Sequence, residues 1–255
     1  MNAPDENRSK EAPQPRTDDL SSDIHRIIIG AIGIVLPFFL VLMARWRPTA
    51  GLDPWPPLSS VSAYYYTGGT SAFAGALIAL GVYFFTYKGY DNPQRWQDWL
   101  ASRLAGLAAI AVVFFPTTAP DAALVPSWWK QYMHHVHGFS AVVLFACFTF
   151  FCVQFRRSNF AKDSLPPDKR WRNRFYAFCG VVILGCIAWL IFNAFNRWPI
   201  FWPEATALIF FALSWLVKGR VVPNTVAVAQ KTVHYVEQTV KGKGEPGSKA
   251  PQKGD

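Results

Sequence analysis

Charged side chains are scarce in this sequence. Asp, Glu, Lys and Arg make up 16% of its 255 residues, whereas a typical soluble domain carries about 25%. Hydrophobic residues reach 51%, and they are concentrated in long uncharged runs rather than in the periodic stripes of a soluble helix. This composition excludes a disordered chain and argues against a soluble enzyme. It predicts a protein whose solvent is largely lipid.

The sequence also lacks the cysteine pattern of a disulfide framework or of a zinc finger. All four cysteines fall inside apolar runs, and their spacings of five and seven residues do not match C-x₂-C. We therefore interpret Cys147, Cys152, Cys179 and Cys186 as small apolar packing residues. The polar stretch before the first apolar run has no A-x-A cleavage pattern, so we expect a retained anchor rather than a removed signal peptide.

The apolar runs predict six transmembrane helices, because a helix needs about 20 residues to cross a hydrocarbon core about 30 Å thick. The sixth uncharged run, 205–217, is too short on its own. Its helix must therefore begin near Pro203, include Glu204 and run toward Pro223. The predicted fold is an all-α polytopic bundle over 27–220. The other five expected spans are 27–44, 68–87, 104–118, 138–155 and 175–196.

The distribution of basic residues predicts the orientation, since Lys and Arg accumulate on the cytoplasmic side of a membrane. Nearly all of the 25 basic residues fall in the two tails and in the second and fourth loops. Both termini are therefore expected on the cytoplasmic side of the membrane. This segregation also accounts for the net charge of +9, so we do not predict nucleic-acid binding. The exceptions on the other side are Arg45, Arg47, Lys130 and Arg197.

The ends of the chain are polar. Residues 1–26 and 241–255 have too little apolar surface to order themselves, and we predict disorder for both. Between them, apolar residues recur at three- and four-residue spacing over 221–240. This pattern fits an amphipathic helix on the inner leaflet or a soluble tail helix.

Small residues at four-residue spacing predict close packing of two spans. The second span carries Ser71, Gly75 and Ala79, and the third carries a matching stripe, Ala101, Ala105 and Ala109. The alternative is that Gly and Ala are simply common in membrane helices.

The predicted topology places most functional-looking side chains at the outer face. Zinc is held by three or four imidazole, carboxylate or thiolate groups, and His134, His137 and Glu204 could supply three. Alternatively, the imidazoles hydrogen-bond to tyrosines, backbone carbonyls or lipid headgroups. Glu204 is the only acid that the six predicted spans require. It is either ion-paired, with Arg197, Arg45 or Arg47, or it is a metal ligand, general base or proton carrier.

Several short motifs resemble a bacterial family of six-helix inner-membrane proteins of unassigned activity. They are SVSAYYYT at 60–67, YKGY at 87–90, FFPT at 114–117, HG at 137–138, and E-A-x-A at 204–207 with SWLVKG at 214–219. More remotely, a serine before the second span, a histidine cluster and a carboxylate near one face are similar to the alkaline ceramidase and adiponectin-receptor group. That resemblance implies zinc-dependent amide hydrolysis. The chain departs from that group in having six expected spans rather than seven and no H-x-x-x-H pair in the last helix.

Three functions follow from these residues. The first is a metal-dependent hydrolase that acts on a lipid-like amide or ester. Zinc would be held by His134, His137 and Glu204, Glu204 would be the catalytic base, and Ser60, Ser62 or a tyrosine would stabilise the oxyanion. The second is a membrane sensor or binding protein for a small amphiphile. In either case the substrate-contacting residues would be Tyr64, Tyr65, Tyr66 and Asn193. The third, a transporter, has least support, since there is no inverted repeat.

Overall fold

The computed structural model describes residues 17–87, 95–157 and 167–219. This part of the chain contains six α-helices and two short 3-10 helices and has no strand. The predicted tail segments 221–240 and 241–255, and residues 1–16 of the N-terminal tail, lie outside the described residues. The elements are α1 (Thr17–Trp46), η1 (Ser62–Tyr66), α2 (Thr70–Thr86), α3 (Arg95–Phe114), η2 (Ala122–Leu124), α4 (Gln131–Arg157), α5 (Pro167–Phe195) and α6 (Phe201–Lys218).

Five of these helices are long and apolar enough to cross a membrane, as expected of a multi-pass membrane protein. They are Ile24–Trp46 within α1, Arg95–Phe114, Gln131–Arg156, Arg170–Phe195 and Phe201–Lys218. The remaining helix, α2, is apolar but has only 17 residues. The all-helical class predicted from the apolar runs is therefore confirmed for the described residues.

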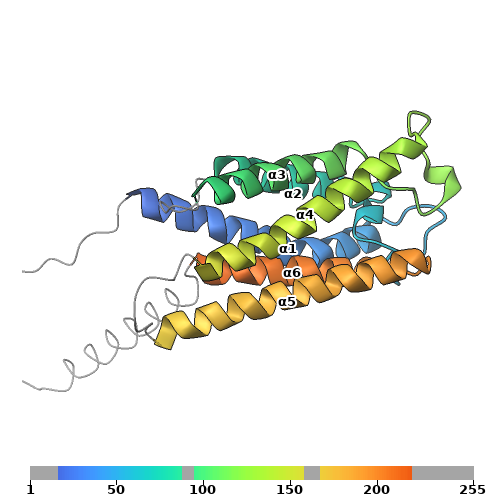
Figure 1. The fold of residues 1–255 in the computed structure, drawn as a ribbon. Coiled ribbons are helices and arrows are strands. Elements are labelled where there is room, and N and C mark those ends of the chain that lie inside the picture. Colours follow the sequence, from blue (N-terminus) through green and yellow to red (C-terminus); the bar gives the residue numbers. More distant parts are fainter. Residues whose placement is uncertain (1–16, 88–94, 158–166, 220–255) are drawn as a thin grey trace, which may run out of the picture. The chain divides into compact units, whose positions relative to one another are not determined.

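The helices pack in sequence order as a closed ring, in which each helix contacts its neighbours along the chain and α6 returns to α1 (Figure 1). Consecutive helices run in opposite directions, so the connections 47–69, 115–130 and 196–200 lie together at one end. We call this the loop end, and we call the opposite end, where α3 and α5 begin and α6 finishes, the tail end. Residues far apart in sequence, such as those of η1 and α6, can therefore meet at the loop end.

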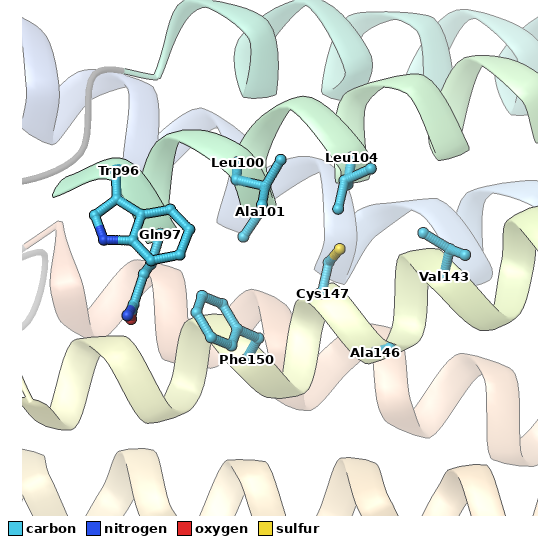
Figure 2. Close-up of a pocket in the computed structure, with 9 residues that line it drawn as sticks. All are labelled: Trp96, Gln97, Leu100, Ala101, Leu104, Val143, Ala146, Cys147 and Phe150. Atoms are coloured by element: carbon cyan, nitrogen blue, oxygen red, sulfur yellow. The ribbon is translucent and has the colours of Figure 1, made fainter. Parts of the chain in front are cut away.

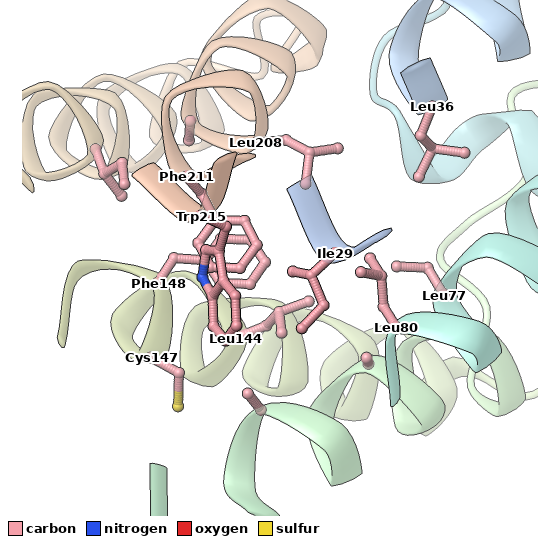
Figure 3. Packing of buried hydrophobic residues seen from close by; sticks show 14 of the residues in the cluster. Ile29, Leu36, Leu77, Leu80, Leu144, Cys147, Phe148, Leu208, Phe211 and Trp215 are labelled. Atoms are coloured by element: carbon pink, nitrogen blue, oxygen red, sulfur yellow. The ribbon is translucent and has the colours of Figure 1, made fainter. Parts of the chain in front are cut away.

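A hydrophobic cluster fills the centre of the ring, and Figure 3 shows Phe148, Phe211 and Trp215 in it among aliphatic side chains. The rings of Phe148 and Phe211 stack with their centroids 3.6 Å apart, and Trp215 lies edge-on to Phe84 and Phe151 at 5.8 Å and 5.2 Å. All five side chains are 0–1% exposed. Because lipid is as apolar as these rings, the packing gains its energy from van der Waals contact rather than from exclusion of water.

Helices α2 and α3 do approach closely, although the predicted contact residues are only half right. Ala101, Ala105 and Ala109 of α3 are buried as expected. On α2, however, Gly75 faces open space, and the close approach is made by Gly81, where a Cβ would lie 2.8 Å from Ile110 Cγ1. The α2 stripe is therefore wrong, because small residues are equally acceptable on a lipid-facing surface.

Helix α3 begins at Arg95, well before the predicted start of the third span at residue 104. Asp98 lies in the first turn of this helix and is 4% exposed. The expectation that Glu204 is the only acid in the spanning helices is therefore wrong. Arg95, Asp98 and Arg103 interrupt the uncharged run, and this hid the first two turns of α3 from a search based on uncharged length.

Candidate functional site

The connection between α1 and α2 is attached to the start of α6. The carbonyl oxygen of Ser59 accepts hydrogen bonds from the backbone N–H groups of Ile200, at 2.6 Å, and Phe201, at 2.9 Å. The first N–H groups of a helix have no partner within that helix, so these bonds satisfy donors that α6 itself cannot. The loop therefore caps the helix that carries Glu204.

Glu204 makes the second attachment between the same two segments. Its Oε2 atom accepts a hydrogen bond from the backbone N–H of Val61 at 2.6 Å, and its side chain is 8% exposed. No ion pair involving Glu204 occurs among the residues that the structure describes. Arg45, one of the predicted ion-pair partners, instead donates to the carbonyl oxygens of Pro54 and Trp55. Glu204 thus binds the loop backbone.

His137 caps the end of α3. Its Nδ1 lies 2.9 Å from the carbonyl oxygen of Phe115 and 3.2 Å from that of Val112. Carbonyl oxygens only accept hydrogen bonds, so Nδ1 carries the proton, and in the neutral ring the lone pair is on Nε2. Pro116 lies directly after these carbonyls, and a proline has no N–H with which to continue a helix. The imidazole supplies the donor that the next turn would have provided.

Two further side chains complete this cap. The indole N–H of Trp129 donates to the carbonyl oxygen of Pro116 at 3.1 Å, and the Tyr66 hydroxyl donates to that of Thr117 at 2.6 Å. Burial raises the pKa of Tyr66 to about 12, so its hydroxyl keeps its proton at neutral pH. His134 lies nearby, with Nδ1 3.4 Å from the Thr117 hydroxyl. The FFPT segment is therefore held by side chains from η1, α4 and the loop before α4.

Three predicted site residues meet at one small cavity. Ser62 of η1, His137 of α4 and Glu204 of α6 all line a space of about 60 Å³, whose other walls are apolar side chains. His137 and Glu204 therefore lie at the same end of the bundle. A water molecule needs roughly 10–15 Å³ of such space, so this central cavity has room for a few waters and not for an amphiphile.

The predicted zinc ligands do not come together in the described residues. No group of three or more His, Cys, Asp or Glu side chains within those residues is close enough to hold a metal ion. Of the three predicted ligands, His137 and Glu204 line the central cavity, whereas His134 is directed to Thr117 and stacks edge-on against His135. Because a catalytic zinc site has three protein ligands and a structural site has four, the two residues that meet at the cavity do not fit the metal.

The serine and tyrosine side chains of the SVSAYYYT segment make most of their contacts within the first loop. The Ser60 hydroxyl accepts from the N–H of Ala63 at 3.0 Å and lies 3.2 Å from the Ser62 hydroxyl. The Tyr64 hydroxyl accepts from the N–H of Leu58 at 3.3 Å, and burial raises the pKa of Tyr64. Tyr65 packs edge-on against Tyr66. Of these five residues, only Ser62 lines the central cavity.

A larger pocket lies beside the central cavity, at the junction of α5, α6 and the first loop. Its volume is about 520 Å³, and Asn193 is its only polar lining side chain. We call it the aromatic pocket. It is lined by Pro57, Leu58, Trp189, Phe192, Asn193, Trp198, Pro199, Phe201 and Trp202. Asn193, predicted as a ligand-contacting residue, therefore belongs to this pocket rather than to the His137–Glu204 cavity.

The end of α5 shapes this pocket. Arg197 has a φ of 56°, and the N–H groups of Arg197 and Trp198 bond back to the carbonyls of Ala194 and Asn193 at 3.2 Å and 2.9 Å. This is a Schellman ending with a non-glycine residue in the left-handed position. The Asn193 amide donates to the carbonyl oxygen of Pro199 at 2.7 Å and so fixes the turn into α6.

The sequence interpretation missed the backbone groups of Ser59 and Val61 and the tryptophans of the aromatic pocket. A backbone carbonyl or N–H is the same in almost every residue, so the amino-acid sequence cannot indicate which of them binds α6. Trp189, Trp198 and Trp202 do carry one, because they cluster around Pro199 and Pro203 at the turn between two spans. Tryptophan is common at membrane interfaces, and this general explanation obscured the cluster. Comparisons of the chain with protein families, with curated proteins and with solved structures find no match.

Proposed function

We propose that this protein binds a small amphiphile in the aromatic pocket at the outer face of a bacterial inner membrane. The observation that carries the proposal is the pocket itself. Its volume of about 520 Å³ falls within the roughly 300–1,000 Å³ of small-molecule sites, which are mostly apolar with a few placed polar groups. The ligand would place an apolar body against the rings and a hydrogen-bond acceptor at the rim.

The tryptophans give the pocket its chemistry. Trp189, Trp198 and Trp202 are 46%, 57% and 59% exposed, so their rings are available to a ligand. Each indole has one N–H that can donate but no acceptor. Oxygen atoms of a carboxylate or an ester fit these donors, and an alkyl chain fits the ring faces. A fatty acid is a ligand of this chemistry.

One wall of the pocket is part of the loop that is attached to α6. Pro57 and Leu58 line the pocket, and the next residues of the loop include Ser59 and Val61, which bond to the start of α6. A ligand that displaces Leu58 would therefore strain both attachments. This arrangement supports a sensing role, in which occupancy of the pocket changes the position of the loop.

The proposed topology has six crossings and cytoplasmic termini. Helix α2 has 17 residues and would reach about 26 Å, close to the roughly 30 Å of a hydrocarbon core. With six crossings, both termini lie on the same side of the membrane. The basic segments that flank the tail end favour the cytoplasm for that side, which leaves the loop end outside. Cysteine labelling from either side of inverted and right-side-out vesicles tests this orientation.

A metal-dependent hydrolase is the second candidate. Ser62, His137 and Glu204 share the central cavity, and this grouping favours chemistry there. The incomplete ligand set and the small volume favour binding in the aromatic pocket instead. Zinc content of the purified protein tests the hydrolase directly. One equivalent of zinc that is lost in His137→Ala would support it, and no zinc in the unmodified protein would remove it.

Photo-crosslinking tests the binding proposal. A fatty acid with a diazirine on its chain is added to the protein in nanodiscs, and the crosslinked peptides are identified by mass spectrometry. We expect crosslinks within 189–202. Since loss of an aromatic anchor commonly costs more than about 1 kcal/mol, Trp202→Ala should lower the labelling about fivefold or more.

Trp128→Ala is the matched control, because Trp128 is 50% exposed at the loop end and does not line the pocket. Its labelling should equal that of the unmodified protein. Equal labelling of Trp202→Ala and Trp128→Ala, or crosslinks distributed evenly along the helices, would show that the fatty acid meets the protein only as bulk lipid does.

A further inference from the structure

A second hollow lies between α3 and α4 near the tail end, away from the aromatic pocket (Figure 2). Its volume is about 620 Å³, and we call it the α3–α4 groove. The hollow exists because the residues in its middle, Ala101, Ala146 and Cys147, are small, whereas larger side chains stand at its ends. Both helices are among those that can cross a membrane, so the groove opens at the depth of lipid chains.

The lining of the groove changes along its length. Figure 2 shows Trp96 and Gln97 at one end and the aliphatic side chains of Leu104 and Val143 at the other. Seven residues separate Gln97 from Leu104, a distance of about 10 Å along a helix. One leaflet of hydrocarbon is about 15 Å deep. The groove therefore has an amphipathic lining and a length that suits most of one acyl chain.

The polar end offers donors. The Gln97 Oε1 atom accepts a hydrogen bond from Gln154 Nε2 at 3.3 Å, which turns the Gln97 amide nitrogen away from Gln154. Trp96 is 63% exposed and carries an indole N–H. Arg156, near the end of α4, is also exposed at this end of the groove. Together these groups complement ester and phosphate oxygens, not a neutral hydrocarbon.

We propose that the α3–α4 groove is a binding site for one phospholipid of the tail-end leaflet. One acyl chain lies over Ala101, Ala146 and Cys147, and the ester and phosphate groups lie beside Trp96 and Gln97. This lipid is held more tightly than its neighbours, because it combines a fitted chain with hydrogen bonds that the surrounding lipids do not make. The site is independent of the aromatic pocket and of its ligand.

Native mass spectrometry of the full chain tests this site, with phosphatidylglycerol added to the detergent-purified protein. We expect one lipid that stays bound at collision energies that remove the others. Ala146→Phe fills the groove and should abolish this bound state. Ala146 is solvent- or lipid-exposed, so the larger side chain need not disturb the core. Ala31→Phe, at an exposed position of α1 that does not line the groove, should retain the lipid.

A second variant distinguishes the site from a folding defect. Gln97→Leu adds no bulk to the middle of the groove and removes the amide donor, so it should weaken retention by roughly three- to tenfold. It also removes the acceptor for Gln154 Nε2, so its thermal unfolding without added lipid is measured beside that of Ala31→Phe and Ala146→Phe, which should be unchanged. Equal lipid retention in the unmodified protein, Ala146→Phe and Gln97→Leu would overturn the proposal and leave only an annular lipid.

Discussion

The attachment between Glu204 and Val61 can be tested by removing each partner in turn. Glu204→Leu removes the acceptor. Val61→Pro removes the donor at a residue whose φ is −60°, the value that a proline ring imposes. Glu204→Gln keeps a carbonyl acceptor in a side chain of nearly the same size. The two single variants and their combination form a double-mutant cycle for one hydrogen bond.

The geometry sets the expected magnitude. The N–H···O distance is 2.6 Å, shorter than the usual 2.9–3.0 Å or so, and the carboxyl is buried. An ordinary intramolecular hydrogen bond contributes about 0.5–1.5 kcal/mol, and interhelical bonds in membrane proteins average about 0.6 kcal/mol. We expect a coupling energy of about 0.5–1.5 kcal/mol, and a loss of about 2 kcal/mol in Glu204→Leu, because the Val61 N–H is left buried without a partner.

The assay is equilibrium unfolding in detergent micelles, followed by tryptophan fluorescence. Glu204→Gln should lose less free energy of unfolding than Glu204→Leu. Val61→Pro should cost clearly less in the Glu204→Leu background than in the unmodified chain, since the bond is already gone there. If Val61→Pro costs the same in both backgrounds, the two residues are not coupled, and the proposed attachment of the loop to α6 is refuted.

Three further predictions concern the bundle and its loops. Arg197→Gly should raise the free energy of unfolding by up to about 1 kcal/mol. The left-handed backbone costs a non-glycine residue roughly 1–2 kcal/mol, and the greater conformational freedom of glycine in the unfolded chain offsets part of the gain from removing this cost. A lower melting temperature would contradict this prediction. Gly81→Val should destabilise the protein by about 1–3 kcal/mol through overpacking. Gly75→Val should be nearly neutral, because position 75 faces open space. Equal losses of stability in the two variants would contradict the close α2–α3 contact. Burial raises the pKa of Tyr66 to about 12 in the folded protein, against an ordinary value of 10. Between these two values the unfolded chain loses the proton first, so the free energy of unfolding falls as pH rises. Tyr66→Phe should show a shallower fall, and an unchanged slope would show that Tyr66 does not contribute.

The fold class was predictable because lipid imposes a strong constraint on sequence. Every backbone polar group inside a membrane must be bonded within its own segment or barrel, so a span appears as a long uncharged run. The predicted spans at 27–44, 68–87, 138–155 and 175–196 all overlap observed helices. The third span was misplaced at its start because charged residues, Arg95, Asp98 and Arg103, interrupt the uncharged run of α3. Such residues are stabilised by neighbours that a window over one segment cannot include.

The candidate site was only partly predictable. The placement of Ser62, His137 and Glu204 at one end followed from counting helices, and in the structure the three line one cavity. The sequence left two roles open for His137, metal binding and hydrogen bonding to groups such as backbone carbonyls, because residue type alone does not distinguish them. Its partner carbonyls on Val112 and Phe115 become identifiable only when α4 lies against the end of α3.

The amino-acid sequence by itself determined that this chain is a bundle of apolar helices, since hydrophobic run length and charge distribution are properties of single segments. The tertiary structure decided which polar groups meet. It attached the first loop to α6 through Ser59 and Val61, directed His134 to Thr117, and opened the aromatic pocket between α5 and that loop. These outcomes depend on the rotation and depth of each helix against its neighbours. Those are set by packing among all six helices at once, which no segment specifies alone.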